Sequence, residues 1–203
     1  MQKKLITIGR QFGSGGSEIG SALAEELGVK CYDKEILFEA AKKSGMCEAV
    51  ASQYDERGQQ SFLYSLATTG YFGNHVDYQP INAKLYGAQF QLIRSIADED
   101  ASSIFIGRCA DYVLEEREEL VKIYISADID YRVKRIAKKY NINESEALKL
   151  IQKRDKQRAS YYNFYTSKKW SEAASYDLCI NSSKVGTIGA VQLILNFLNL
   201  EEM

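Results

Sequence analysis

The chain is poor in the residues on which several protein classes depend. It has one proline, one histidine and four cysteines in 203 residues. The cysteines are scattered and form no CxxC pair, so we expect reduced thiols and neither a disulfide framework nor a zinc site. His75 cannot form a histidine-based metal site by itself.

Long apolar runs and blocks of one charge sign are also missing. No window holds 18 consecutive apolar residues, and the short apolar run near the N-terminus leads directly into a glycine-rich segment. We therefore expect no membrane partner and no signal peptide, and a cytoplasmic protein. The net charge is −1 with acids and bases mixed along the chain, which argues against a nucleic-acid partner. The apolar content of 45% is enough for a core, and the length predicts one domain over residues 1–203.

Apolar runs and helical periodicities alternate along most of the chain. Strands are predicted at Leu5–Gly9, Val29–Asp33, Ser103–Gly107, Val121–Ser126 and Tyr176–Asn181. Helices are predicted at Ser17–Leu27, Asp33–Lys43, Asp128–Lys139, Asn143–Arg158 and Gly186–Leu200. Asn143 and Glu146 have the spacing of a capping box.

This alternation predicts a doubly wound α/β fold, because strands that are apolar throughout suit a parallel sheet covered on both faces. Residues 45–101 contain no convincing strand and predict a helical insert. We expect this insert to lie over the carboxyl edge of the sheet, where ligands of open α/β sheets bind.

A glycine-rich turn joins the first strand to the first helix and predicts a phosphate site. Glycine allows backbone N–H groups to converge on an anion, and the helix N-terminus adds unpaired donors. A standard P-loop reads GxxxxGK[ST], and here a glycine stands in the lysine position. The predicted phosphate-binding residues are Gly13, Ser14, Gly15, Gly16, Ser17 and Glu18.

Two residues near this turn could supply what the missing lysine and the metal require. Ser17 has the hydroxyl that would contact Mg²⁺, and Arg10 is the nearest cation that could reach over the loop. A glycine turn without a ligand is the structural alternative. A dinucleotide site is less well supported, because Glu18 stands where GxGxxG requires the last glycine.

Four stretches together resemble the cytidylate kinase-like family of P-loop proteins. They are the glycine loop followed by LAEELGVKCYDKEIL, then IFIGRCADYVL, RDKQRASYYNFYTSKKW and YDLCINSS. The resemblance spans nearly the whole chain. It implies a three-layer P-loop kinase-like fold, with a five-stranded, mostly parallel sheet in the order 2-3-1-4-5, a helical insert and an arginine-rich lid at residues 154–172. It also implies ATP as donor, with Mg²⁺.

Arginines suit phosphoryl transfer because their planar fork grips two oxygens at once. Arg154 and Arg158 are four residues apart on one predicted helix and share a face. By the resemblance, Asp155 and Arg158 would contact the acceptor and Arg154 the transferring phosphate. A solvated helix end is the alternative. Arg132 would either face the phosphates or pair with Asp128.

Arg108 follows the predicted third strand and matches the arginine of the family's GR pair, which makes it a candidate ligand of the acceptor phosphate. The family's next residue is aspartate, and Cys109 stands there in this chain, with Asp111 as a possible substitute. Asp33 would touch the metal or the nucleophile, or else cap the next helix.

Together these features predict an ATP- and Mg²⁺-dependent kinase for a small acceptor, most simply a nucleoside monophosphate. The catalytic candidates are Arg10, Arg108, Arg154 and Arg158, and the acceptor candidates are Asp33, Arg108, Asp111, Asp155 and Arg158. A nucleotide sensor or an inactive relative is the alternative, which the absent lysine and Cys109 favour.

Overall fold

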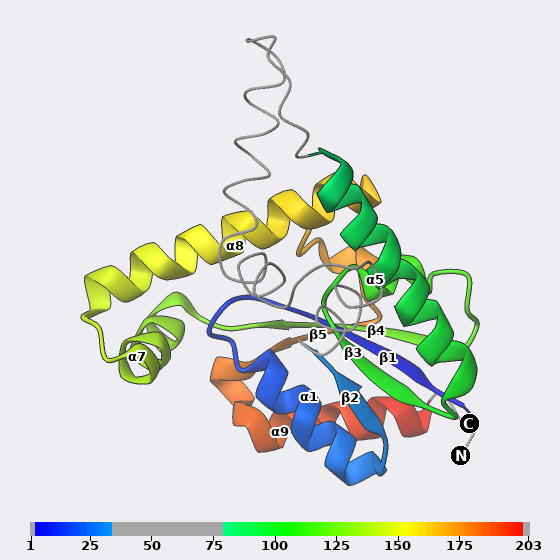
Figure 1. Ribbon diagram of the computed structural model, residues 1–203. Coiled ribbons are helices and arrows are strands. Elements are labelled where there is room, and N and C mark those ends of the chain that lie inside the picture. The colour runs from blue at the N-terminus through cyan, green and yellow to red at the C-terminus, as the bar shows by residue number, and fades with distance from the viewer. Residues whose placement is uncertain (1–2, 34–78, 201–203) are drawn as a thin grey trace, which may run out of the picture. The chain divides into compact units, whose positions relative to one another are not determined.

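The computed structural model describes residues 3–33 and 79–200, and one five-stranded parallel sheet organises most of them (Figure 1). The strand order is β2-β3-β1-β4-β5, and every neighbouring pair runs parallel. The predicted P-loop kinase-like architecture is confirmed. The strands are β1 (Leu5–Arg10), β2 (Lys30–Tyr32), β3 (Ser103–Ile106), β4 (Leu120–Ser126) and β5 (Leu178–Asn181).

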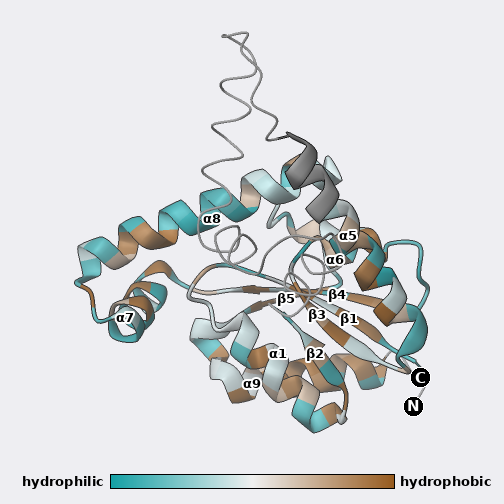
Figure 2. Cartoon of the chain, in the orientation of Figure 1, coloured by the Kyte–Doolittle hydropathy of each residue, from teal (hydrophilic) through white to brown (hydrophobic). Residues whose placement is uncertain are grey.

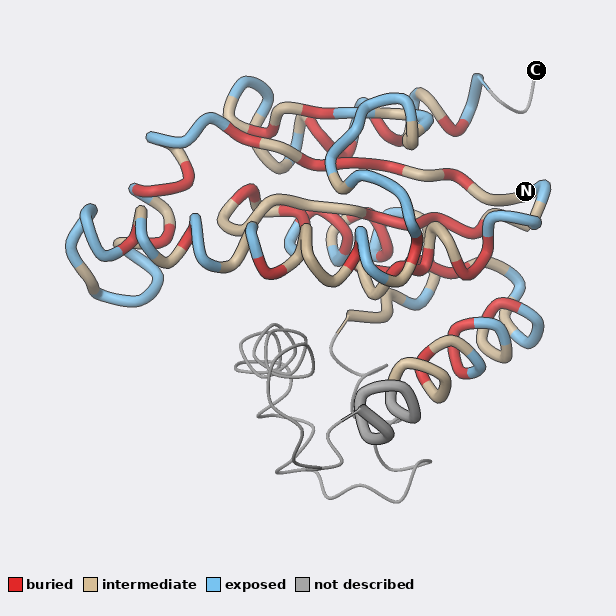
Figure 3. The backbone as a smooth tube through the Cα atoms, turned by 90° about the horizontal axis from the view of Figure 1, so that it is seen from above, coloured by how far each residue is buried: buried red, intermediate tan, exposed pale blue. Residues whose placement is uncertain are grey.

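The central strand β1 explains why continuous apolar runs predicted a parallel sheet. Its residues Leu5, Ile6, Thr7 and Ile8 are all buried, although successive side chains point to opposite faces. Figure 3 shows exposed stretches mostly on loops and on the outer turns of helices. Both faces of the strand are therefore covered, as crossover helices require. In register, Ile6 pairs with Ile104 of β3 on one side and Val121 of β4 on the other.

Two helices, α1 (Gly16–Leu27) and α9 (Ser182–Leu200), lie together on one face of the sheet (Figure 1). Leu23 and Ile194 join the strand residues in the main core, and Figure 2 shows the apolar colouring concentrated on the strands and on the helix faces beside them. A Cβ at Gly20 would collide with the Cδ1 atom of Ile106, so this glycine lets α1 approach the sheet closely.

A second pair, α7 (Ile129–Tyr140) and α8 (Glu144–Thr166), forms a hairpin with its own small core. The core consists of Val133, Ile136, Ala147 and Ile151, and Phe12 of the glycine turn packs against it. The capping box predicted at Asn143 and Glu146 is present at the start of α8. The glycine turn is thus anchored in this hairpin through an apolar side chain.

Several element bounds differ from the predictions. Helix α8 continues to Thr166 and not only to Arg158, and α9 begins at Ser182, before the left-handed kink at Gly186 (φ 66°). A four-residue helix, α6 (Ala110–Val113), was not predicted, because so short an element has no readable periodicity. A 3₁₀ turn spans Ala173–Ser175.

The chain divides into two compact units, Met1–Tyr32 with Asp100–Met203, and Asp33–Glu99. The described part of the second unit is Asp33 and helix α5 (Gln79–Glu99). The predicted helix at 33–43 beyond Asp33, and residues 45–78 of the predicted insert, lie outside the described residues. Among the described helices, none combines the length and apolarity needed to cross a bilayer.

Candidate functional site

The glycine turn lies at the carboxyl end of β1 and leads directly into α1. Gly13 (φ 84°) and Gly15 (φ 82°) adopt left-handed backbone conformations that other residues rarely tolerate. The first bond of α1 runs from the Ile19 amide to the Gly15 carbonyl (2.9 Å), so the amides of Gly16, Ser17 and Glu18 precede the first helical bond. This geometry suits a bound anion.

Hydrogen bonds within the glycine turn, and hydrogen bonds that join it to Ala127 and Ser182, fix its shape. The Ser14 hydroxyl is buried and donates to the Gln11 carbonyl (2.9 Å), and the Ser182 hydroxyl donates to the Ser14 carbonyl (2.6 Å). The side-chain oxygen of Gln11 accepts from the Ala127 amide (3.0 Å), just beyond β4. The turn is therefore held before any ligand arrives.

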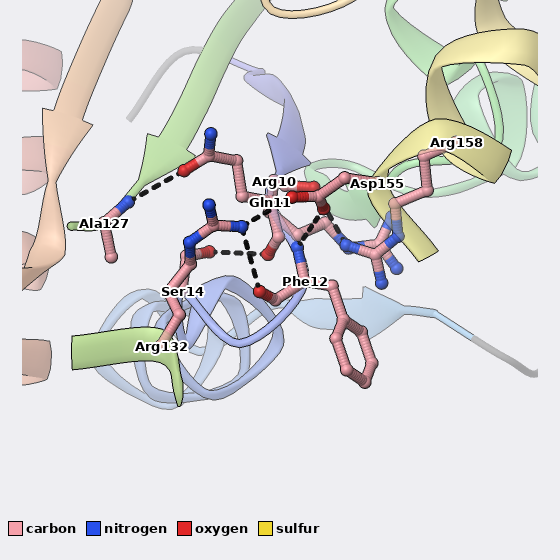
Figure 4. Close-up of polar contacts among 8 residues, drawn as sticks. All are labelled: Arg10, Gln11, Phe12, Ser14, Ala127, Arg132, Asp155 and Arg158. Carbon is pink, nitrogen blue, oxygen red and sulfur yellow. Dashed lines mark hydrogen bonds and ion pairs between the residues drawn. The ribbon is translucent and has the colours of Figure 1, made fainter. Parts of the chain in front are cut away.

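The backbone of Phe12 is clamped by an ion pair from the α7–α8 hairpin (Figure 4). The Phe12 amide donates to one oxygen of Asp155 (2.7 Å), and Arg132 donates to the other oxygen (2.5 Å) and to the Phe12 carbonyl (3.3 Å). The side chains of Arg132 and Asp155 are 9% and 18% exposed. Arg132 thus pairs with Asp155 and not with Asp128, the pairing considered from the sequence.

Arg158 also contacts the turn. It donates to the Arg10 carbonyl (2.9 Å), and its guanidinium carbon lies 5.6 Å from the centre of the Phe12 ring. Arg154 lies one turn earlier on α8. The structure therefore brings Asp155 and Arg158 to the phosphate turn, and their role in acceptor binding stays a prediction.

A second ion pair, between Arg135 and Glu18, lies where the glycine turn passes into the first turn of α1. Arg135 on α7 donates to both carboxylate oxygens of Glu18 at 2.7 Å, and this hydrogen bonding to Glu18 raises the pKa of the guanidinium. A Cβ at Gly15 would lie 3.6 Å from a guanidinium nitrogen of Arg135. Sequence reasoning missed Arg135, although its spacing of three from Arg132 places both on one helix face.

Arg10, the last residue of β1, runs alongside two glycines. A Cβ at Gly16, the lysine position, would lie 2.6 Å from the Cβ and 2.9 Å from the Cγ of Arg10. A Cβ at Gly107 would collide with the Nη1 atom of Arg10. The guanidinium therefore lies at the end of β3, beside the residue that precedes Arg108.

Arg108 sits on a left-handed turn that directly follows β3. Gly107, Arg108 and Cys109 have φ values of 69°, 60° and 56°, and the Ala110 amide closes the turn on the Gly107 carbonyl (3.1 Å). Two consecutive non-glycine residues in this region cost energy, and such strain gathers at functional sites. Cys109 is buried, and burial raises the pKa of its thiol.

Asp111 and Tyr162 join α6 to α8. The Tyr162 hydroxyl donates to Asp111 (2.7 Å), and burial raises the pKa of both groups. Aromatic side chains in this region pack against the rest of the protein, because Tyr162 is buried and the ring of Trp170 packs edge-on against Tyr124. Acceptor binding by Asp111 stays a prediction.

Asp33 follows β2 directly and belongs to the second unit. The helix that it would cap lies outside the described residues, so both interpretations of Asp33 stay predictions.

Comparison with known proteins agrees with this arrangement. Residues 5–184 match the cytidylate kinase-like family. A cytidylate kinase from Methanothrix thermoacetophila is 29% identical over 191 residues, which cover 94% of this chain and 95% of that protein. A cytidylate kinase from Methanosarcina mazei is 30% identical over 181 residues, which cover 88% and 87%.

Solved structures show the same fold. An uncharacterized protein from Eubacterium ventriosum has a TM-score of 0.73 and 29% identity, with 97% of this chain and 99% of that chain covered. Shikimate kinase from Bacteroides thetaiotaomicron has a TM-score of 0.57 at 15% identity, with 97% and 98% covered, and shares the fold. With a match that spans most of its length, the chain belongs to the cytidylate kinase-like family.

Proposed function

We propose that the protein transfers a phosphoryl group from ATP to a small acceptor, most simply a nucleoside monophosphate such as CMP. One observation carries the proposal: the amides of Gly16, Ser17 and Glu18 precede the first helical bond of α1 at the carboxyl edge of the sheet, among side chains of Arg10, Arg135 and Arg158. Phosphoryl transfer requires mainly positioning and positive charge around the moving group, and this site offers both. The curated relatives named cytidylate kinase support the same activity.

The two ends of the site would have different tasks. The amides of the glycine turn would hold the donor phosphates, as helix N-termini hold anions. Arg108, presented by the strained turn after β3, would bind the acceptor phosphate from the neighbouring strand end. Arg154 and Arg158 would align the transferring phosphate from α8, with Asp155 orienting the acceptor.

The residues at the turn fit Mg²⁺ bound together with ATP. The exposed Ser17 supplies a hydroxyl oxygen, a hard ligand of the kind Mg²⁺ prefers. When bound, the ion neutralises phosphate charge. In the described part of the chain, no three His, Cys, Asp or Glu side chains gather into a possible metal site.

A nucleotide sensor is the second candidate. Gly16 at the lysine position and Cys109 after Arg108 favour it, because both depart from the pattern of active relatives. Under this alternative, ATP binds without turnover.

The deciding experiment incubates the protein with ATP, Mg²⁺ and separate nucleoside monophosphates and nucleosides, and measures ADP and the phosphorylated acceptor. We expect acceptor-dependent ADP formation, fastest with one monophosphate, and at least tenfold slower formation with Arg108→Ala. Arg117→Ala, three residues before β4 and thus near the opposite sheet edge, is the matched control. ATP binding in calorimetry without turnover of any acceptor would refute the kinase and support the sensor.

A further inference from the structure

A side chain at residue 16, the lysine position, would have no space beside Arg10. Gly16 is the first residue of α1, and a side chain there would start within 2.6 Å of the Cβ of Arg10 and 2.9 Å of its Cγ. Real Cβ atoms do not approach other carbons so closely, and the Cβ of Arg10 cannot swing away because it is fixed to the backbone of β1. A side chain at residue 16 and the stem of Arg10 therefore exclude each other.

The guanidinium end of the Arg10 side chain also lies against a glycine, Gly107. A Cβ at Gly107 would collide with the Nη1 atom of Arg10, and Gly107 has a φ of 69°, which favours glycine in any case. The Gly107 amide donates to the Ile8 carbonyl (3.1 Å), so the ends of β3 and β1 are tied together at this point. Glycine thus stands at both ends of the path that the Arg10 side chain follows.

We propose that Arg10 takes over the task of the missing lysine, and that Gly16 and Gly107 are glycines because they make room for it. Its guanidinium would bind the phosphates between the donor turn and the acceptor residue Arg108. The proposal rests on the kinase function proposed above and names the cation of that site. Glycine at residue 16 is then a requirement of an arginine-based site and not the loss of a catalytic group.

A different cation, Arg135, also lies near the turn, but its position differs. It is bound through both oxygens of Glu18 and lies beside Gly15, whereas Arg10 begins at the lysine position itself and ends at the strand that presents Arg108. Arginine also suits a position between two phosphates, because its fork can bind two oxygens.

A stability cycle tests the steric part without any substrate. The melting temperature is measured for the wild type, Gly16→Ala, Arg10→Gly and the double variant, because only glycine at residue 10 removes the Cβ that lies 2.6 Å from the new side chain. We expect Gly16→Ala to lower the melting temperature by about 2–10 °C, because it overpacks a fixed neighbour. In the Arg10→Gly background the same change should cost less than about a third of that. An equal loss in both backgrounds would overturn the proposal.

A swap of the two cations tests the functional part. Affinity for a non-hydrolysable ATP analogue with Mg²⁺ is measured by calorimetry for Arg10→Ala, for Gly16→Lys and for a double variant that combines Arg10→Gly with Gly16→Lys, since glycine at residue 10 also removes the clashing Cβ. Arg10→Ala should weaken binding about tenfold or more. The double variant, with lysine at residue 16 and the space vacated, should recover most of the loss. Arg117→Ala, near the opposite sheet edge, should bind like the wild type. Wild-type affinity in Arg10→Ala, or in a fully stable Gly16→Lys single variant, would overturn the proposal.

The two proposals fail in different ways. Weakened analogue binding in Arg10→Ala, together with no turnover of any acceptor by the wild type, would support the role of Arg10 and refute the kinase. Acceptor turnover that is unchanged in Arg10→Ala would support the kinase and refute the role of Arg10. No analogue binding by the wild type would overturn both.

Discussion

The ion pair between Arg132 and Asp155 provides a sharp test of how the phosphate turn is held. Asp155 accepts from the Phe12 amide and from Arg132, and Arg132 also donates to the Phe12 carbonyl. The three groups form a closed ring between the glycine turn, α7 and α8. We predict that removing either partner destabilises the fold strongly, because it leaves the other charge mostly buried and alone.

The magnitude follows from burial. With side chains only 9% and 18% exposed, the pair is shielded from water, and breaking such a pair costs about 3–5 kcal/mol. Asp155→Ala also leaves the Phe12 amide without its acceptor. We therefore expect Asp155→Ala and Arg132→Ala each to lower the free energy of unfolding by about 3 kcal/mol, which corresponds to about 6–12 °C in melting temperature.

The assay is a double-mutant cycle in urea. Because the second removal no longer leaves a lone charge, the double variant should lose clearly less than the sum of the single losses, with a coupling of about 2 kcal/mol. The exposed pair Glu115–Lys168, at 41% and 43% side-chain exposure, serves as the control and should couple by less than about 1 kcal/mol. Additive losses for Arg132 and Asp155 would refute the ring as a unit.

Three further predictions follow from charged and polar contacts. Glu18→Gln should tighten binding of the ATP analogue about three- to tenfold in calorimetry, because it removes a negative charge beside the turn and releases Arg135. Hydrogen bonding, most of all to Lys184, lowers the pKa of Asp128 to about 2 in the folded protein. The contribution of Asp128 to stability is therefore present above about pH 4 and is lost as the pH falls toward 2. The melting temperature of Asp128→Asn should consequently fall less steeply than that of the wild type in this interval. Tyr162→Phe should cost about 1–3 kcal/mol in urea unfolding, because the partly buried carboxyl group of Asp111 loses its hydroxyl donor.

Each of these changes has a matched control on the same kind of element. Glu25→Gln lies in the last turn of α1, Asp130→Asn in the first turn of α7, and Tyr140→Phe at an exposed helix end. None should reproduce the effect of its partner. Weaker analogue binding in the Glu18 variant, parallel pH curves for the Asp128 variant, or equal unfolding losses in the two tyrosine variants would contradict the respective prediction.

Much of the fold could be predicted because its signals are local. The strand around Leu5–Ile8 is apolar apart from Thr7, and the capping box at Asn143 marks the start of α8 within the sequence itself. The predicted end of α8 at Arg158 was wrong, because the helix continues for more than two further turns to Thr166. Thr166 is stabilised by contacts that hydrophobic periodicity does not report. Helix α6 was missed because four residues carry no period.

The candidate site was likewise predictable only where its signals are local in the sequence. The sequence by itself determined the order of strand, glycine turn and helix, the family motifs, and the absence of a lysine at residue 16, since all of these are read from neighbouring residues. Only the tertiary structure decided that Arg135 joins the site, that Asp155 clamps Phe12, and that the stem of Arg10 fills the space beside Gly16. Those contacts join residues that only the packing of helices against the sheet brings together, and no spacing along the chain encodes how their side chains share that space.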